Sequence, residues 1–271
     1  MTSLKPIGVF DSGLGGLTAM RALRRLLPHE DLICLGDTAR VPYGTRSAQT
    51  VVRFALQDAQ FLLRKDVKLV VVACGTVSSI AMDELRKKCP VPVVGIVEPS
   101  AKVAVATTQS HRIAILGTNA TIRSRAIEQE VLKLDASAQV YGLACPLLVP
   151  LIENGYVRAD QPILRLALQE YMKYVINHKV DTIILGCTHY PLVATAIQEC
   201  LPTARLIDSG EAIALAVARL LESEGLANDP EHVGSRCYYV TDTVANFADM
   251  VELFLGGPGD GEIHQVDIGA W

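Results

Sequence analysis

The sequence predicts an α/β protein built from two pseudo-symmetric, doubly wound domains with mainly parallel sheets and an active site in the cleft between them. Short apolar segments rich in β-branched residues alternate with amphipathic segments along the 271 residues, as in parallel α/β proteins. Two of the apolar segments, 68–73 and 181–186, run into the cysteines Cys74 and Cys187. Similar segments also recur in the two halves of the chain, which indicates a duplication.

Three pairs of similar segments carry this repeat. Their offsets are 106 residues (7–12 with 113–118), 113 residues (Cys74 with Cys187) and 110 residues (97–101 with 207–211). Matches in the same order at nearly constant spacing indicate a duplicated α/β unit of about 110 residues. The alternative is that any two buried parallel strands look alike, since apolar runs that end in small residues recur in such folds.

The first elements follow from the apolar periodicity and its breaks. A strand over 7–10 precedes a helix over 17–27, whose leucines and methionine share one face and which Pro28 ends. A second strand covers 31–35, and a loop leads to a helix that Ser47 caps and that ends by residue 65. The strand that runs into Cys74 completes this part.

The same alternation continues to the end of the chain. Further strands are expected near 93–97, 112–116, 138–143, 181–186 and 204–208, with helices between them. Residues 225–234 read as a surface connection, and the glycine-rich run 256–261 precedes a last short strand. Chain crossings near Glu98 and Asp208 would give one domain of residues 1–97 plus 209–271 and a second domain of residues 98–208.

Composition excludes several classes of function. The chain has 25 basic and 29 acidic residues, a net charge of −4, so we expect neither nucleic acid nor a membrane surface as a partner. Its seven cysteines are scattered without a C-x-x-C pair, which opposes a disulfide framework and a zinc site. No signal peptide or membrane-spanning stretch is apparent. We therefore expect a cytoplasmic protein that acts on a small molecule.

Cys74 and Cys187 are the main candidates for chemistry. Each follows a predicted strand, and ligands bind at the carboxyl edge of parallel sheets. Two thiols at such edges suggest a reaction in which one sulfur approaches from each side. Thr76 and Thr188 follow them, and their hydroxyls could cap a helix or bind an anion. The alternative is that both cysteines fill the core, as the other five are expected to do.

Three further residues are candidates beside the thiols. Asp11 starts a turn whose glycines do not have the G-x-G-x-x-G spacing of a dinucleotide site, so it could instead accept a proton or hold an ammonium group. It could equally cap a plain tight turn. His189, two residues after Cys187, could stabilise a thiolate or shuttle its proton, or be a solvated helix-end residue. Glu153 could be a surface carboxylate, since its spacing does not place it near a thiol.

Four sequence strings resemble those of the glutamate racemases, within the aspartate/glutamate racemase family. They are residues 9–16, 36–44, 73–76 and 186–192, with 150–155 and 208–210 interposed in the matching order. The resemblance covers nearly the whole chain. It implies an isomerase that interconverts L- and D-glutamate without a cofactor or metal and supplies D-glutamate for peptidoglycan, cell wall biogenesis and cell shape. It also implies a homodimer.

The resemblance further implies a role for each site residue. Cys74 would exchange the α-proton on the D-face with help from Asp11, and Cys187 on the L-face with help from Glu153 and His189. Two bases are required because inversion needs removal from one face and delivery to the other. The substrate-binding residues would be Asp11, Ser12, Tyr43, Gly44, Gly75, Thr76, Thr188 and His189.

One position departs from the family pattern. The first thiol is usually followed by Asn and Thr, whereas this chain has Gly75. Loss of one hydrogen bond to a charged group would cost roughly 1.5–3 kcal/mol, so we expect weaker binding or a water in place of the amide. Family members activated by a nucleotide precursor of peptidoglycan carry an additional N-terminal segment, so no such activation is expected here.

Three alternatives to a glutamate racemase remain at this point. One is a racemase of aspartate or another amino acid, which would have the same thiols. Another is a non-catalytic amino-acid-binding relative, for which Gly75 is the best sequence argument. The third is a thiol hydrolase with one Cys–His pair, which leaves Cys74 unexplained.

Overall fold

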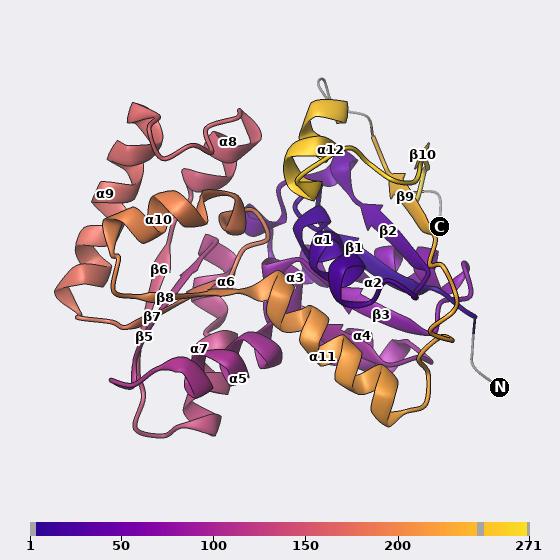
Figure 1. The fold of residues 1–271 in the computed structure, drawn as a ribbon, viewed down its shortest axis with the longest axis horizontal. Helices are drawn as coiled ribbons and strands as arrows, with labels where there is room; N and C mark the ends of the chain where they lie inside the picture. Colours follow the sequence, from indigo (N-terminus) through magenta and orange to yellow (C-terminus); the bar gives the residue numbers. More distant parts are fainter. Residues whose placement is uncertain (1–3, 243–246, 270–271) are drawn as a thin grey trace.

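The computed structural model describes residues 4–242 and 247–269. It contains two lobes, each a sheet of parallel strands covered by helices (Figure 1). The first sheet contains β1 (Ile7–Asp11), β2 (Leu32–Gly36), β3 (Leu69–Val72), β4 (Val93–Gly95), β9 (Arg236–Val240) and β10 (Glu262–Gln265). The second sheet contains β5 (Arg112–Gly117), β6 (Gln139–Ala144), β7 (Thr182–Leu185) and β8 (Arg205–Asp208).

The strand order shows the duplication directly. The first sheet has the order β10-β9-β2-β1-β3-β4, and the second has the order β6-β5-β7-β8. The block β2-β1-β3-β4 therefore recurs as β6-β5-β7-β8. All strand pairs are parallel, with Phe10 opposite Val72 in the first sheet and Leu116 opposite Leu185 in the second. The predicted fold, two pseudo-symmetric lobes with parallel sheets, is confirmed.

The helices connect successive strands and cover the sheets. They are α1 (Leu17–Leu26), α2 (Ala48–Leu63), α3 (Gly75–Ile80), α4 (Met82–Lys88), α5 (Val97–Thr107), α6 (Asn119–Ser124), α7 (Ala126–Leu134), α8 (Leu148–Glu153), α9 (Pro162–Asn177), α10 (Ala194–Cys200), α11 (Ser209–Ser223) and α12 (Phe247–Leu255), with short 3₁₀ turns η1 (Thr38–Arg40), η2 (Tyr43–Thr45) and η3 (Tyr190–Val193). As predicted, the Ser47 side chain caps α2, accepting the backbone N–H of Thr50 at 3.3 Å.

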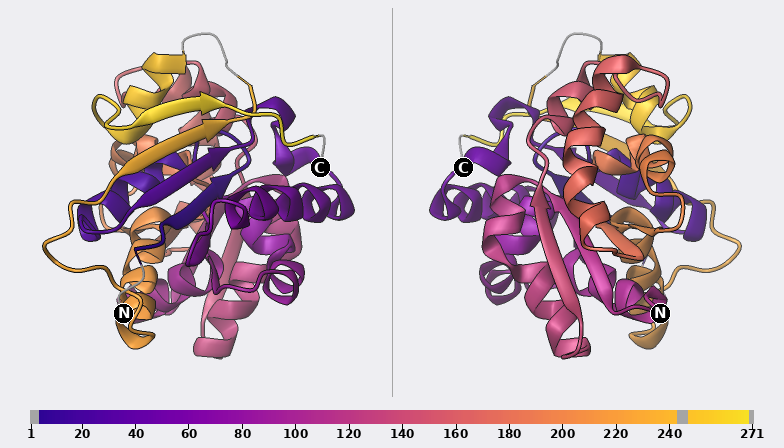
Figure 2. Two further views of the ribbon diagram at one scale, coloured as in Figure 1. Left: turned by 90° about the vertical axis from the view of Figure 1, so that its right-hand side faces the viewer. Right: turned by 90° about the vertical axis from the view of Figure 1, so that its left-hand side faces the viewer.

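Two expectations about the strands are wrong. The strand near 93–97 ends at Gly95, because α5 already begins at Val97. The strand β9 was not expected at all. It is only five residues long, Arg-Cys-Tyr-Tyr-Val, and β9 pairs with β2 on one side and β10 on the other. Figure 2 shows β9 and β10 at one edge of the first sheet, where the end of the chain returns to the first lobe.

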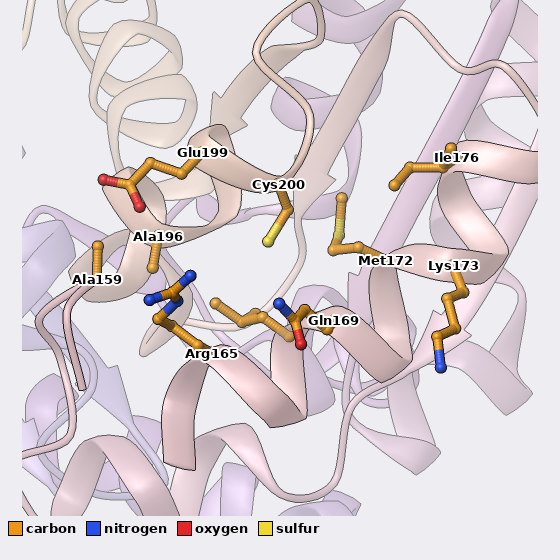
Figure 3. A pocket seen from close by; sticks show the side chains of 10 residues that line it. Ala159, Arg165, Gln169, Met172, Lys173, Ile176, Ala196, Glu199 and Cys200 are labelled. Carbon is orange, nitrogen blue, oxygen red and sulfur yellow. The ribbon is translucent and has the colours of Figure 1, made fainter. Parts of the chain in front are cut away.

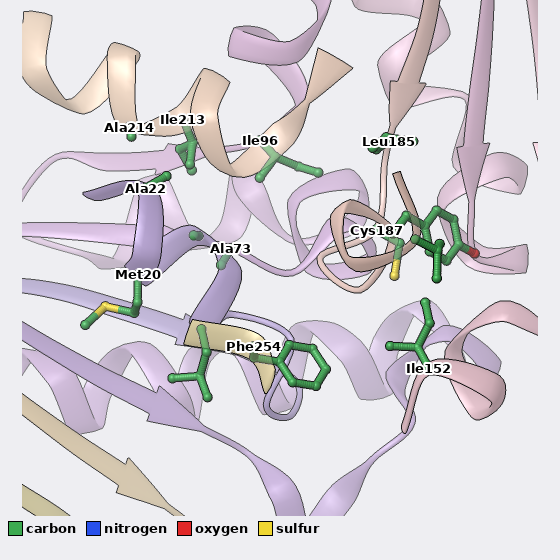
Figure 4. Close-up of a cluster of buried hydrophobic side chains, with 14 of the residues drawn as sticks. Met20, Ala22, Ala73, Ile96, Ile152, Leu185, Cys187, Ile213, Ala214 and Phe254 are labelled. Carbon is green, nitrogen blue, oxygen red and sulfur yellow. The ribbon is translucent and has the colours of Figure 1, made fainter. Parts of the chain in front are cut away.

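The apolar core continues from one lobe to the other. One cluster of buried side chains includes Met20 and Ala73 of the first lobe together with Ile152, Leu185 and Cys187 of the second (Figure 4). The helix α11 packs against both α1 and α5. The helices α5 and α11 begin at the predicted domain boundaries, 97/98 and 208/209, and they pack on each other. This contact does not assign either helix to one domain, so the boundaries stay a prediction. No helix in the described ranges is long and apolar enough to span a membrane.

Candidate active site

The two cysteines occupy equivalent places in the two lobes. Cys74 follows β3 and is the N-terminal cap residue of α3, and Cys187 lies two residues after β7, the counterpart of β3. Both are buried, with 5% and 6% of their surface exposed. They line one cavity of about 260 Å³ between the lobes. The fold therefore brings together two thiols that are 113 residues apart in the sequence, at positions 74 and 187.

Nearly all the predicted site residues line this cavity. The exception is Asp11, which is buried next to it at the end of β1. The predicted residues that line the cavity are Ser12, Tyr43, Gly44, Cys74, Gly75, Thr76, Glu153, Cys187, Thr188 and His189. Their segments come from both lobes, so the cavity exists only where the two carboxyl edges face each other.

The Cys74 thiol has two polar neighbours. It donates to the Ser12 hydroxyl, with 3.3 Å between Sγ and Oγ. Burial, followed by the negative charge of Asp11, raises the pKa of Cys74 to about 12, while the Ser12 hydrogen bond acts in the opposite direction. Cys74 is therefore a neutral thiol near pH 7.

Asp11 is a buried carboxyl group with free hydrogen-bonding capacity. Its Oδ2 atom accepts the backbone N–H of Gly13 at 3.2 Å, whereas Oδ1 has no hydrogen-bond partner among the described residues. Burial raises the pKa of Asp11 to about 6, against the positive charge of His189 and the backbone N–H groups of the turn. An unpartnered oxygen of this kind can accept a proton from Cys74 or bind an ammonium group.

Cys187 is flanked by a histidine and a carboxylate in a row. The Nδ1 atom of His189 lies 3.9 Å from Sγ of Cys187, and its Nε2 atom lies 3.0 Å from Oε1 of Glu153. Burial opposes the charge on His189, but hydrogen bonds to Cys187 and Glu153 outweigh it and raise its pKa to about 10. The imidazole is therefore a cation at pH 7, next to the second sulfur, where it can stabilise a thiolate.

The end of α8 places Glu153. The helix ends at this residue, and Gly155 then takes a φ of +80°, a left-handed conformation that favours glycine. The backbone N–H of Gly155 donates to the carbonyl of Ile152 at 2.9 Å, closing the last turn. Because Pro150 and Glu153 line the cavity, this short helix forms one of its walls.

The threonines join the two lobes across the cavity. The hydroxyl of Thr76 lies 3.0 Å from that of Thr118, which lies 3.0 Å from the hydroxyl of Thr121 and caps α6. Thr118 and its neighbour Asn119 were not predicted as site residues, although both line the cavity. A signal was present: in the repeat, Thr118 at the end of β5 corresponds to Ser12 at the end of β1.

Tyr43 is placed differently from a simple substrate ligand. Its hydroxyl is hydrogen-bonded to the carboxylates of Asp37 and Asp58, the latter at 3.1 Å, and the side chain is fully buried. Burial, followed by these two carboxylates, raises the pKa of the phenol. Any contact between Tyr43 and a ligand would therefore come from its backbone or ring rather than from the hydroxyl.

A separate cavity of about 450 Å³ lies between α9 and α10 (Figure 3). Arg165, Glu199 and Cys200 line it, and none of the predicted site residues does. It is thus distinct from the cavity that holds the thiols. Within the part of the chain that the structure describes, no three His, Cys, Asp or Glu side chains are grouped so that they could hold a metal ion.

A duplicated α/β fold in which each half presents one thiol to a shared cavity is the arrangement expected of a racemase, because inversion at a carbon needs one acid or base on each face. The chain belongs to the Asp/Glu/Hydantoin racemase family, whose model matches residues 7–217.

Individual relatives agree with this assignment. The chain is 44% identical to the glutamate racemase of Syntrophus aciditrophicus over 255 residues, with 93% of each chain covered. It resembles the crystal structure of glutamate racemase from Francisella tularensis in complex with D-glutamate, with a TM-score of 0.91, 34% identity, and 98% and 99% of the two chains covered. The structure of the Thermus thermophilus glutamate racemase in complex with β-chloro-D-alanine gives a TM-score of 0.87 at 42% identity, with 98% of each chain covered.

Proposed function

We propose that this protein interconverts L- and D-glutamate without a cofactor, with Cys74 and Cys187 as the two bases. The observation that carries the proposal is the shared cavity, to which each lobe contributes one buried thiol with its own proton partner. The relatives named glutamate racemase cover nearly the whole chain and support glutamate as the substrate.

In the direction from D-glutamate, the Cys74 thiolate removes the α-proton. The electron pair of the broken C–H bond stays on the α-carbon and its carboxylate, and the Cys187 thiol delivers its proton to the opposite face. The reverse direction exchanges the two roles. Which sulfur serves which face follows from the resemblance to the family.

Proton transfer at each sulfur uses a different partner. Cys74 has a pKa raised to about 12, so it needs an acceptor to become a thiolate, and the unpartnered Oδ1 of Asp11 supplies one. Cys187 has the His189 cation, which Glu153 holds in place through Nε2. The two sides of the cavity therefore differ in charge, with a carboxyl group beside Cys74 and a cation beside Cys187.

The substrate is held by groups that converge on the same space. Ser12, Thr76 and Thr188 offer hydroxyls, and Gly44 and Gly75 offer backbone N–H groups to the carboxylates. Asp11 is the one carboxyl group here that combines complete burial with an unpartnered oxygen, and it suits the ammonium group. We also expect cytoplasmic activity, from the composition of the chain, and a homodimer and a role in peptidoglycan synthesis, from the family resemblance.

The proposal is tested in heavy water without added cofactor. The wild-type protein should convert each enantiomer of glutamate into the other and place deuterium at the α-carbon of the product. Cys74→Ala and Cys187→Ala should each lower the rate of inversion by about 10²- to 10⁴-fold. Cys200→Ala, which changes a cysteine at the separate cavity, is the matched control. Inversion at the wild-type rate in either active-site variant would contradict the two-base assignment.

A further inference from the structure

The first lobe touches the chain on both sides of Cys187, at Gly186 and at Thr188. On the first side, a Cβ atom built on Gly75 would lie closer than 3.0 Å to the carbonyl oxygen of Gly186 and 3.1 Å from its carbonyl carbon. Real Cβ atoms do not approach an oxygen so closely. The Cα of Gly75, next to Cys74, is therefore packed directly against the backbone next to Cys187.

On the other side of Cys187, the contact is a hydrogen bond. The hydroxyl of Thr18, on α1, lies 2.9 Å from the carbonyl oxygen of Thr188 and equally close to the carbonyl oxygen of Gly15, as a shared donor. Thr18 is 3% exposed, so no water competes freely for this donor. Gly15 is also close to this segment, because a Cβ there would lie 2.7 Å from the His189 ring.

We propose that Gly75 and Thr18 are positioning residues that set the separation of the two thiols. They fix Gly186 and Thr188, and so the Cys187 sulfur between them, against the lobe that carries Cys74. The inference rests on the proposed function and deepens it, because Thr18 lies outside the cavity lining and Gly75 acts here through its missing side chain, in addition to its backbone N–H group.

The separation matters because each proton moves only when sulfur and carbon are in near contact. A methyl group at position 75 must displace the Gly186 carbonyl, and with it Cys187, by up to about 1 Å, a misplacement that can cost about 10²-fold in rate. The carbanion would then be reprotonated more often by the sulfur that removed the proton, after that S–H has exchanged with the solvent. Exchange at the α-carbon would continue while inversion fails.

The same contact changes the interpretation of the family difference at this position. From the family pattern, in which an asparagine follows the first thiol, the only expected effect of Gly75 is the loss of an amide that binds substrate. In this structure an asparagine at 75 would meet the Gly186 backbone before its amide reached a ligand. Gly75→Asn is therefore expected to lower the rate of inversion rather than to improve binding.

The experiment compares Gly75→Ala with the wild type in heavy water, starting from each enantiomer of glutamate. The deuterium in recovered substrate is measured against the deuterium in product by mass spectrometry after chiral separation. We expect inversion to fall by about 10²-fold and the ratio of exchange to inversion to rise by about tenfold or more. Gly257→Ala is the matched control, since nothing lies within 4 Å of a Cβ there.

A second pair of variants, at Thr18, tests the proposal even if Gly75→Ala does not fold. Thr18→Val removes the hydroxyl and keeps the shape, and it should raise the same ratio. Thr18→Ser restores the donor and should return the ratio close to the wild-type value. Melting temperatures of all variants identify any that are unfolded.

Two results separate this inference from the proposed function. A wild-type protein that inverts neither enantiomer contradicts the proposed function. An active wild type, with folded Gly75→Ala and Thr18→Val variants whose ratio of exchange to inversion is unchanged, contradicts the positioning role even if their overall rates fall.

Discussion

Glu153 and His189 form a hydrogen-bonded ion pair that runs from the edge of the cavity to the second thiol. Oε1 of Glu153 lies 3.0 Å from Nε2 of His189, and the other ring nitrogen points to Cys187 at 3.9 Å. The carboxylate side chain is 43% exposed and that of the histidine 9%. The pair therefore connects solvent to a buried sulfur, and, together with the hydrogen bond to Cys187, it keeps the imidazole protonated.

Glu153→Gln should lower the pKa of His189 from about 10. Glutamine keeps an oxygen that can accept a hydrogen bond from Nε2, but it removes the negative charge. The pKa of His189 should therefore fall by about one unit. This is a small shift for the loss of a charged partner, because Glu153 is half-exposed. Above the new, lower pKa the cation beside Cys187 is lost. An NMR titration of the His189 ring measures the shift directly, and an unchanged midpoint would show that Glu153 does not hold the proton.

Asp11→Asn tests the first thiol through the pH dependence of activity. The pKa of Asp11 is raised to about 6, so its carboxylate is present above that pH and lost as the pH falls through it. Because ionised Asp11 is the proton acceptor for Cys74 in the proposed mechanism, kcat/KM should decrease below about pH 6 in the wild type. The asparagine variant should be slower and lack this acidic limb.

The control for this pH profile is Asp160→Asn, which changes an exposed carboxylate paired with Arg158. It should leave the acidic limb in place. If the Asp11→Asn profile keeps the same limb as the wild type, another group is responsible and Asp11 is not the acceptor.

The sequence predicted the fold and the pair of thiols because both depend on local patterns. Buried parallel strands appear as apolar runs, and the residue after such a run must lie at the carboxyl edge of its sheet. The repeat also predicted that the two edges would correspond, as Cys74 and Cys187 do. Strand β9 was not predicted because it is only five residues long and begins with an arginine, so its apolar run is short.

Other parts of the site depend on contacts that no spacing reveals. Glu153 precedes His189 by 36 residues and meets it only because α8 packs against η3. The approach of Gly75 to Gly186 involves no side chain, so the sequence records only that a glycine is present. Thr118 is the intermediate case, since the repeat pairs it with Ser12 but only the structure shows its bond to Thr76.

Cys74 should react slowly with iodoacetamide in the free protein. Its pKa is raised to about 12, by burial first and then by Asp11. Since the thiolate is the reactive form, alkylation at pH 8.5 should be about 10³-fold slower than for an unperturbed thiol of pKa near 8.5. Asp11→Asn should speed the reaction, because removing the negative charge lowers this pKa. Mass spectrometry of the peptide that contains Cys74 measures both rates, and equal rates in the native and denatured proteins would contradict the raised pKa.

A buried ion pair at the opposite edge of the first sheet should control stability without affecting the chemistry. Nζ of Lys68 lies 2.6 Å from Oε2 of Glu30, with both side chains at most 3% exposed. Lys68 also donates to the Leu226 carbonyl and the Asn228 side chain, which ties the connection between α11 and β9 to the sheet. Lys68→Met should lower the free energy of unfolding by about 3–5 kcal/mol, because it leaves a buried carboxylate without its partner.

The double variant Glu30→Met/Lys68→Met separates the cost of the unpaired charge from the contribution of the pair. With both charges gone no ion remains buried alone, so the double variant should be more stable than Lys68→Met despite carrying one more substitution. Lys87→Met, which breaks an exposed pair with Glu84, should leave the unfolding midpoint unchanged. Urea unfolding at pH 7 measures the free energy of unfolding and the midpoint of every variant. The single variant Glu30→Met completes the comparison. If the double variant loses as much free energy of unfolding as the two single variants together, the charges of Lys68 and Glu30 are not coupled in the folded protein.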